Sequence, residues 1–172
     1  MSTKLEVWQR GPLPGIAPLL QPVAHAHMQA REEISDYMYE FPVDLLWVRP
    51  AGLASAGFHL QHLSGVLDRV FTYARSESLS ELQFKQLSEE GVDSGHITAD
   101  DLVERFSQQV DIALQQIKDT DELSLTDFRG IGRASLPSTV VGLLFHAAEH
   151  TMRHVGQLMV TVAVVKAKVF EI

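Results

Sequence analysis

Near its carboxyl end the chain reads Leu143-Leu144-Phe145-His146-Ala147-Ala148-Glu149-His150-Thr151-Met152-Arg153-His154-Val155-Gly156-Gln157-Leu158. Apolar residues recur in this segment at helical spacing, and no glycine or proline interrupts it before Gly156, which predicts a helix. His146, His150 and His154 follow one another at intervals of four residues. Side chains so spaced share one helix face, and therefore two of these imidazoles can bind a single metal ion. The other interpretation is a helical histidine pair that binds no metal.

The composition sets limits on the class of protein. Of 172 residues, 45% are hydrophobic and 21% are charged, which suits one globular domain over residues 1–172 with a sizeable core. The formal net charge of −8 argues against nucleic acid and anionic membranes as partners. The absence of cysteine excludes disulfides and cysteine-ligated metal sites. Because no signal peptide and no apolar run of membrane-spanning length is evident, we expect a cytoplasmic protein.

The beginning of the chain predicts an arm followed by a long helix. Residues 1–17 are rich in glycine and proline, so we expect an extended arm that packs Trp8 or Leu13 against the body. The first helix is expected from about Pro18 or Pro22 to Phe41. His27 lies on its apolar stripe, and we interpret it as a histidine at the edge of the core with a hydrogen-bond partner.

The middle of the chain predicts a second and a third long helix with a short helix between them. The second spans about Leu53 to Arg75, and His62 lies at the border of its apolar face. Ser80 begins a capping box, which predicts a short helix over Glu81 to Glu89. Thr98 marks the start of the third long helix, which ends near Asp119.

The last part of the chain predicts a loop and the helix that carries the histidines. Residues 122–136 show no clear period and are expected to be a loop, while Ser135 or Ser138 caps a fourth long helix that reaches about Val169. Four long amphipathic helices predict an all-α bundle, in which sites are built from side chains on different helices. The second helix then offers His62 as the third metal ligand.

Two segments resemble the DinB-like (DinB/YfiT-type) family. They are His150-Thr151-Met152-Arg153-His154-Val155-Gly156-Gln157, similar to the family's His-x-x-x-His followed by x-Gly-Gln, and His62-Leu63-Ser64-Gly65-Val66-Leu67, similar to its second-helix ligand segment. The resemblance implies a four-helix bundle with up-down-down-up topology and a divalent metal on His62, His150 and His154. One departure is Ser64, because the family often has an acidic residue there.

The resemblance also assigns roles to residues around the ligands. His59 and His146 each lie one turn before a ligand, so we expect them to support ligands or to line a pocket. Gln157 or Glu149 is expected to orient a ligating imidazole. The reactive group is unknown and is either a metal-bound water or a thiolate, with Glu149 and Arg69 as further catalytic candidates. Three arginines are candidates to hold an anionic substrate group: Arg69, Arg133 and Arg153.

Three functional hypotheses follow from this set of residues. The first is a metal-dependent enzyme acting on a small molecule, either a transferase or isomerase that uses a low-molecular-weight thiol, as some DinB-like proteins are, or a hydrolase. The second is a non-catalytic metal-binding, ligand-binding or stress-response protein. The third is a structural metal that ties two helices together. Zinc or nickel is the expected metal, because imidazole ligands suit both.

The fourth helix also predicts how the chain associates. From about Ser138 to Val169 it would be roughly 48 Å long, more than the first or second helix can cover. The excess carries apolar residues that need a partner: Val160, Val162, Val164, Val165 and Val169. Either the amino-terminal arm or a second subunit covers them, and we expect a homodimer.

Overall fold

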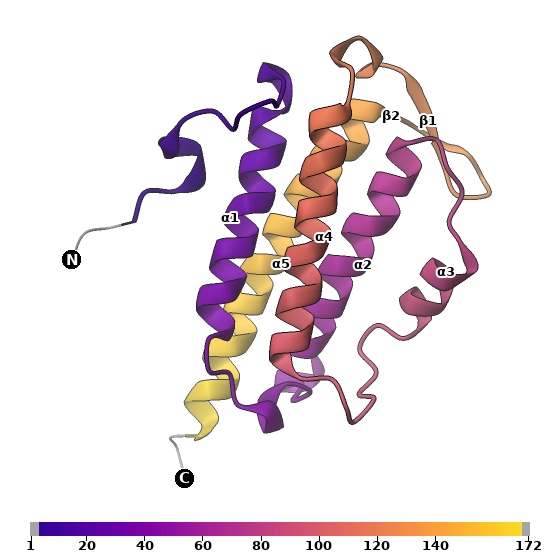
Figure 1. The fold of residues 1–172 in the computed structure, drawn as a ribbon. Coiled ribbons are helices and arrows are strands. Elements are labelled where there is room, and N and C mark those ends of the chain that lie inside the picture. Colours follow the sequence, from indigo (N-terminus) through magenta and orange to yellow (C-terminus); the bar gives the residue numbers. More distant parts are fainter. Residues whose placement is uncertain (1–3, 170–172) are drawn as a thin grey trace.

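Four long helices form an up-down-down-up bundle (Figure 1). The computed structural model describes residues 4–169, with side chains as far as residue 167. The long helices are α1 (Gln21–Met38), α2 (Ala56–Ala74), α4 (Ala99–Asp119) and α5 (Val140–Val169). In Figure 1, α1 and α5 run in one direction, whereas α2 and α4 run in the other. The predicted all-α bundle and its topology are therefore confirmed.

The core follows from the apolar spacing of the helices. Both α1 and α2 pack against α4 and against α5. The buried face of α4 shows the three-and-four spacing that places side chains on one side of a helix. Its members are Leu102, Phe106, Val110, Ala113 and Ile117. Short 3-10 turns complete the chain: η1 (Val7–Arg10), η2 (Pro18–Leu20), η3 (Val43–Leu45), η4 (Pro50–Gly52) and η5 (Glu122–Ser124). None of the described helices is long and apolar enough to span a membrane.

Side-chain caps begin the second long helix and the two helices that follow it in the chain. Ser55 Oγ accepts a hydrogen bond from the Phe58 amide at the start of α2. A capping box at Ser80 begins α3 (Glu81–Ser88), the short helix that the sequence predicted. Thr98 begins α4 with a second capping box. By contrast, α1 ends at Met38, three residues earlier than predicted.

A β-hairpin occupies part of the region predicted to be a loop. Strand β1 (Phe128–Ile131) pairs antiparallel with β2 (Leu136–Thr139), and Figure 1 places the hairpin at one end of the bundle. Positive φ angles at Gly132 and Ser135 close the turn between the strands. Because β2 continues to Thr139, the helix starts at Val140 and neither Ser135 nor Ser138 caps it. Thr139 does so, accepting a hydrogen bond from the Gly142 amide.

The amino-terminal arm packs against α1 and contains a 3-10 turn, so it is not wholly extended. Val7 is buried and its amide donates to the side chain of Gln29 on α1. Of the two residues offered as the packing residue of the arm, Trp8 is 62% exposed and is not the one that packs on the body. Leu13 does pack against the core. The described part of the arm, residues 4–17, is thus engaged with α1, and Val160 and Val164 on α5 are exposed in the described structure.

His27 lies deeper than the sequence indicated. It has no exposed surface, and among the described residues neither ring nitrogen has a hydrogen-bond partner. The edge of its ring faces Phe71, with the ring centroids 5.8 Å apart. The predicted hydrogen-bond partner is therefore absent from the described structure. Burial lowers the pKa of His27 to about 4, so the ring is neutral at physiological pH.

Candidate metal centre

The three histidines predicted as ligands lie together between α2 and α5. Each offers one ring nitrogen, and these atoms lie within 4.8 Å of one another. Nε2 of His62 is 2.9 Å from Nε2 of His150. The ring centroid of His154 lies 4.4 Å from that of His62 and 4.6 Å from that of His150. His150 and His154 come from successive turns of α5, while the neighbouring α2 supplies His62.

A buried carboxylate fixes the orientation of His62. Glu90, in the turn after α3, has an Oε2 atom 2.7 Å from Nδ1 of His62, and its side chain is only 7% exposed. An ionised carboxylate only accepts hydrogen bonds, so Nδ1 of His62 carries the proton. Nε2, the other ring nitrogen of His62, faces His150. Carboxylate–histidine pairs of this kind orient metal-binding imidazoles in many proteins.

Arg69 completes this arrangement on the same helix as His62. Its Nη1 donates to Oε1 of Glu90 at 2.7 Å, so the carboxylate bridges Arg69 and His62. Burial alone would raise the pKa of Glu90, but the hydrogen bonds and charges of His62 and Arg69 lower it below its usual value. Glu90 is therefore ionised at physiological pH. Arg69 is buried and engaged by Glu90, which leaves it poorly placed to bind a substrate anion.

Gly65 makes room for the carboxylate. A Cβ atom built at Gly65 would lie 2.5 Å from Oε1 of Glu90 and 2.6 Å from Nη1 of Arg69. Ser64, at the position where the resemblance suggested an acidic residue, donates its hydroxyl to the Leu60 carbonyl instead. The carboxylate next to His62 thus comes from the turn after α3 and not from α2.

The other predicted residues surround the cluster in different ways. Nδ1 of His59 lies 3.2 Å from Nδ1 of His154, so His59 contacts a predicted ligand directly. His146 is exposed, and its Nδ1 lies 2.9 Å from Oε1 of Glu149. Glu149 also accepts from Arg153. The described hydrogen bonds of Glu149 therefore go to His146 and Arg153, and not to the histidine that it was predicted to orient.

Three of the histidines in and beside the cluster have a lowered pKa: His59, His150 and His154. Burial and the neighbouring imidazoles lower the pKa of His154 to about 4. Burial and the adjacent His62 lower the pKa of His59 to about 4 as well. The pKa of His150 is lowered as well, chiefly by burial. Neutral imidazoles keep the lone pairs that metal binding needs. The three converging ring nitrogens of His62, His150 and His154 fit a divalent transition metal, for which imidazole is a suitable ligand.

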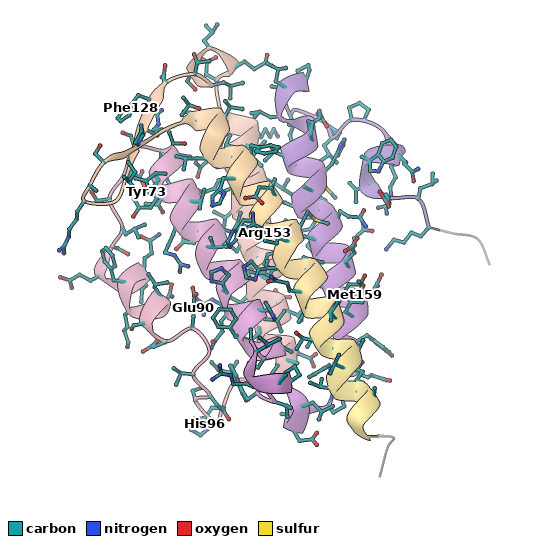
Figure 2. The ribbon with its side chains drawn as sticks, turned by 180° about the vertical axis from the view of Figure 1, so that it is seen from behind. Tyr73, Glu90, His96, Phe128, Arg153 and Met159 are labelled. Atoms are coloured by element: carbon teal, nitrogen blue, oxygen red, sulfur yellow. The ribbon has the colours of Figure 1, made fainter. Side chains whose placement is uncertain are left out.

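The other two arginine candidates, Arg153 and Arg133, line different cavities. Arg153 lines a cavity that also includes His59 and Gln157. Arg133 lines a separate cavity beside the hairpin, together with Tyr73. In Figure 2, Arg153 lies where α2 and α5 adjoin, whereas Glu90 lies on the α3 side of α2. Of the three arginines, Arg153 is therefore the one exposed next to the histidines.

Sequence reasoning missed Glu90. The residue lies 28 positions after His62 and follows a short surface helix, so no helical spacing connects the two. The acidic pair Glu89-Glu90 resembles an ordinary solvated helix end. The glycine inside α2 was the one available signal, because a helical glycine marks a close approach of another group.

Comparisons with known proteins agree with this geometry. The family model of the DinB superfamily matches residues 26–158. A solved structure of a conserved protein from Enterococcus faecalis superposes with a TM-score of 0.67 at 18% sequence identity, covering 88% of this chain and 99% of that one, which shows a shared fold. No curated protein matches this sequence. Because the family model covers most of the chain, including all three clustered histidines, the chain belongs to the DinB superfamily.

Proposed function

We propose that this protein binds one divalent metal ion through His62, His150 and His154 and uses it as an enzyme acting on a small molecule. The observation that carries the proposal is the convergence of three imidazole nitrogens within 4.8 Å. Membership of the DinB superfamily supports it, because it suggests a metal-binding helical protein. Zinc and nickel are the metals we expect, because both accept imidazole ligands.

A set of three protein ligands favours catalysis over a structural role. Structural zinc sites have four protein ligands, whereas catalytic sites have three and an open position. The ligand histidines are partly exposed, which gives a small molecule access to them. When bound, the metal would serve as a Lewis acid toward water or a thiol.

The protein's own residues have separate tasks in this proposal. Glu90 accepts a hydrogen bond from Nδ1 of His62 and holds the ring in one orientation. His59 packs against His154 and limits its rotation. Arg153 and Gln157 line the cavity beside the cluster, where they are available to bind polar groups of a substrate. A reaction dependent on a low-molecular-weight thiol is favoured by the family resemblance, and hydrolysis is the second candidate reaction.

A non-catalytic role is the alternative function. The same site would then hold a metal or a ligand without turnover. The partial exposure of the ligands is compatible with either function. What separates them is turnover, so the two hypotheses need an activity measurement in addition to metal analysis.

Metal analysis of untagged protein, prepared without added metal, tests the binding part of the proposal. We expect one metal ion per chain in the wild type and loss of that metal in His154→Ala. His96→Ala is the matched control, because His96 is an exposed loop histidine outside the cluster. Full retention of metal in His154→Ala would contradict the assigned ligands.

An activity screen tests the catalytic part. Metal-loaded and metal-stripped protein would be incubated with electrophiles in the presence of glutathione, mycothiol or bacillithiol, and with hydrolysable substrates without thiol. We expect turnover by the metal-loaded wild type and none by His154→Ala. Stoichiometric metal without turnover of any substrate would favour the non-catalytic alternative.

A further inference from the structure

A cavity of about 470 Å³ adjoins the histidine cluster along the groove between the start of α2 and the middle of α5. Its volume is within the range of small-molecule sites. His59 lines the cavity and also contacts His154, so one wall of the cavity is in direct contact with the cluster. The cavity therefore lies where a molecule reacting at the cluster would bind the rest of its structure.

The lining of the cavity combines an apolar part with a cationic end. Leu53, Ala54 and Val160 supply apolar surface, and Leu53 and Val160 are both exposed. Arg153 is the cationic residue in the lining, which contains no carboxylate. It precedes Val160 by two turns of α5, so the charge lies at the end of the cavity nearer the cluster.

Arg153 keeps hydrogen-bond donors for a ligand. Its Nη2 donates to Glu149, and this is its one hydrogen bond among the residues that the structure describes. A guanidinium has five N–H donors in a planar fork that matches a carboxylate. Because Arg153 is the charged residue in the lining, its remaining N–H groups favour a ligand with a negatively charged group.

Gly156 keeps the cavity open. A Cβ atom built at this position meets no other heavy atom within 4 Å, and the residue is helical. The backbone of α5 thus forms part of the cavity wall. A larger side chain at this position would enter the cavity without displacing the core.

We propose that the cavity binds a small organic anion with an apolar body, whose carboxylate pairs with Arg153 and whose body packs on Leu53 and Val160. This names the substrate class of the metal enzyme proposed above and rests on that function. The apolar groups supply affinity through the area they remove from water. The charged pair orients the ligand in the groove, so that one end faces His59 and the cluster.

Calorimetric titration with 4-phenylbutyrate, and with neutral 4-phenyl-1-butanol as its counterpart, tests the assignment on zinc-loaded protein. We expect Gly156→Leu to weaken binding of both probes by about tenfold or more, because it fills the cavity. Arg153→Gln should weaken binding of the carboxylate by about tenfold and that of the alcohol by less than about twofold.

Two matched controls accompany these variants. Ala163→Leu places the same leucine side chain at an exposed position of α5 outside the cavity. Arg31→Gln removes an arginine that, like Arg153, pairs with one carboxylate, here Asp111. Both should bind the probes as the wild type does. Circular dichroism and metal content of every variant verify that the fold and the cluster are intact.

The outcomes separate this inference from the proposed function. Wild-type protein that holds metal but binds neither probe at millimolar concentration would overturn the assignment and leave the metal site standing. Equal binding of the carboxylate by wild type and Gly156→Leu would overturn it as well. A third outcome is a wild-type protein that acquires no metal but binds the probes, with the binding weakened by Gly156→Leu and Arg153→Gln as expected. This outcome would refute the proposed metal enzyme and leave the cavity as an anion-binding site.

Discussion

Glu90 and His62 share a hydrogen bond of 2.7 Å, although they are 28 residues apart and lie on different elements. The contact joins the turn after α3 to the face of α2 that adjoins the histidine cluster. Since Arg69 holds the other carboxylate oxygen, the position of Glu90 is fixed from two sides. We infer that Glu90 positions His62 for metal binding, and this role leads to two predictions.

Glu90→Gln should weaken zinc binding by about 10-fold to 100-fold, the usual effect of losing a group that orients a metal-binding histidine. The neutral amide accepts a weaker hydrogen bond from Nδ1 of His62 than the carboxylate does. It also leaves the buried Arg69 without a negatively charged partner. Competition with a chelating dye measures the affinity. Glu89→Gln is the control, because Glu89 is exposed and pairs only weakly with Lys85, 3.8 Å away. Equal zinc affinity in the two variants would refute the positioning role.

Gly65→Ala should reproduce the effect of Glu90→Gln without a change in the metal ligands. The added methyl group would lie 2.5 Å from Oε1 of Glu90, so the carboxylate has to move away from His62. Because the atoms it meets belong to flexible side-chain ends, we expect weaker zinc binding and little loss of stability. Gly156→Ala, at an open helical position, should keep its affinity and gain about 0.5–1 kcal/mol of stability. The opposite order of zinc affinities would contradict this prediction.

The residues that bring the cluster together were predictable because helical geometry relates them. His150 and His154 lie four positions apart, and a regular helix places such residues on one face regardless of tertiary context. His62 was predicted as the third ligand because the sites of helical bundles consist of side chains from facing helices. Likewise the cap at Ser80 predicted α3, since a capping box depends on residues three positions apart.

The unpredicted features depend on contacts that local patterns do not encode. Glu90 meets His62 only because the chain returns to α2 after α3. The strand β2 was missed because Pro137-Ser138-Thr139 resembles a helix start, whereas pairing with β1 keeps these residues extended. On α5, Val162 and Val165 looked as exposed as Val160, but they are buried in the bundle. The side chain of Val169 lies outside the described residues.

His27 predicts a dependence of stability on pH. Its pKa is about 4 in the folded protein and about 6.5 when unfolded, so the unfolded chain binds more protons between these values. Stability from the neutral ring is complete above about pH 6.5 and falls as the pH drops toward 4. Between pH 7.5 and pH 5.0 this residue should cost about 2 kcal/mol. Urea unfolding of metal-free protein at both pH values measures the change.

His27→Leu isolates this contribution, because the other histidines titrate in both proteins. We expect the variant to lose about 2 kcal/mol less than the wild type between the two pH values. It should also be as stable or more stable at pH 7.5, since the substitution removes two buried ring nitrogens without described partners. His96→Leu, at an exposed position, should behave as the wild type. An unchanged pH dependence in His27→Leu would contradict the assignment.

The exposed apolar residues of α5 predict a homodimer. This helix has 30 residues, whereas α1 has 18 and α2 has 19. Near its end and outside the cavity, Met159 and Val164 are exposed, and the described part of the amino-terminal arm packs elsewhere, on α1. We therefore expect a second copy to cover this surface through a two-fold contact. Sedimentation at micromolar concentration should give a species of twice the 19.1 kDa chain mass.

Val164→Glu tests which surface forms the dimer. A charge at a buried two-fold contact faces its own copy and loses water, so the variant should sediment as a single species of 19.1 kDa. Ile112→Glu introduces the same charge at an exposed apolar position of α4, and it should remain dimeric. If Ile112→Glu dissociates while Val164→Glu does not, the contact lies on α4. A wild-type species of 19.1 kDa would rule out the dimer, and the apolar end of α5 would then be exposed to solvent in the isolated chain.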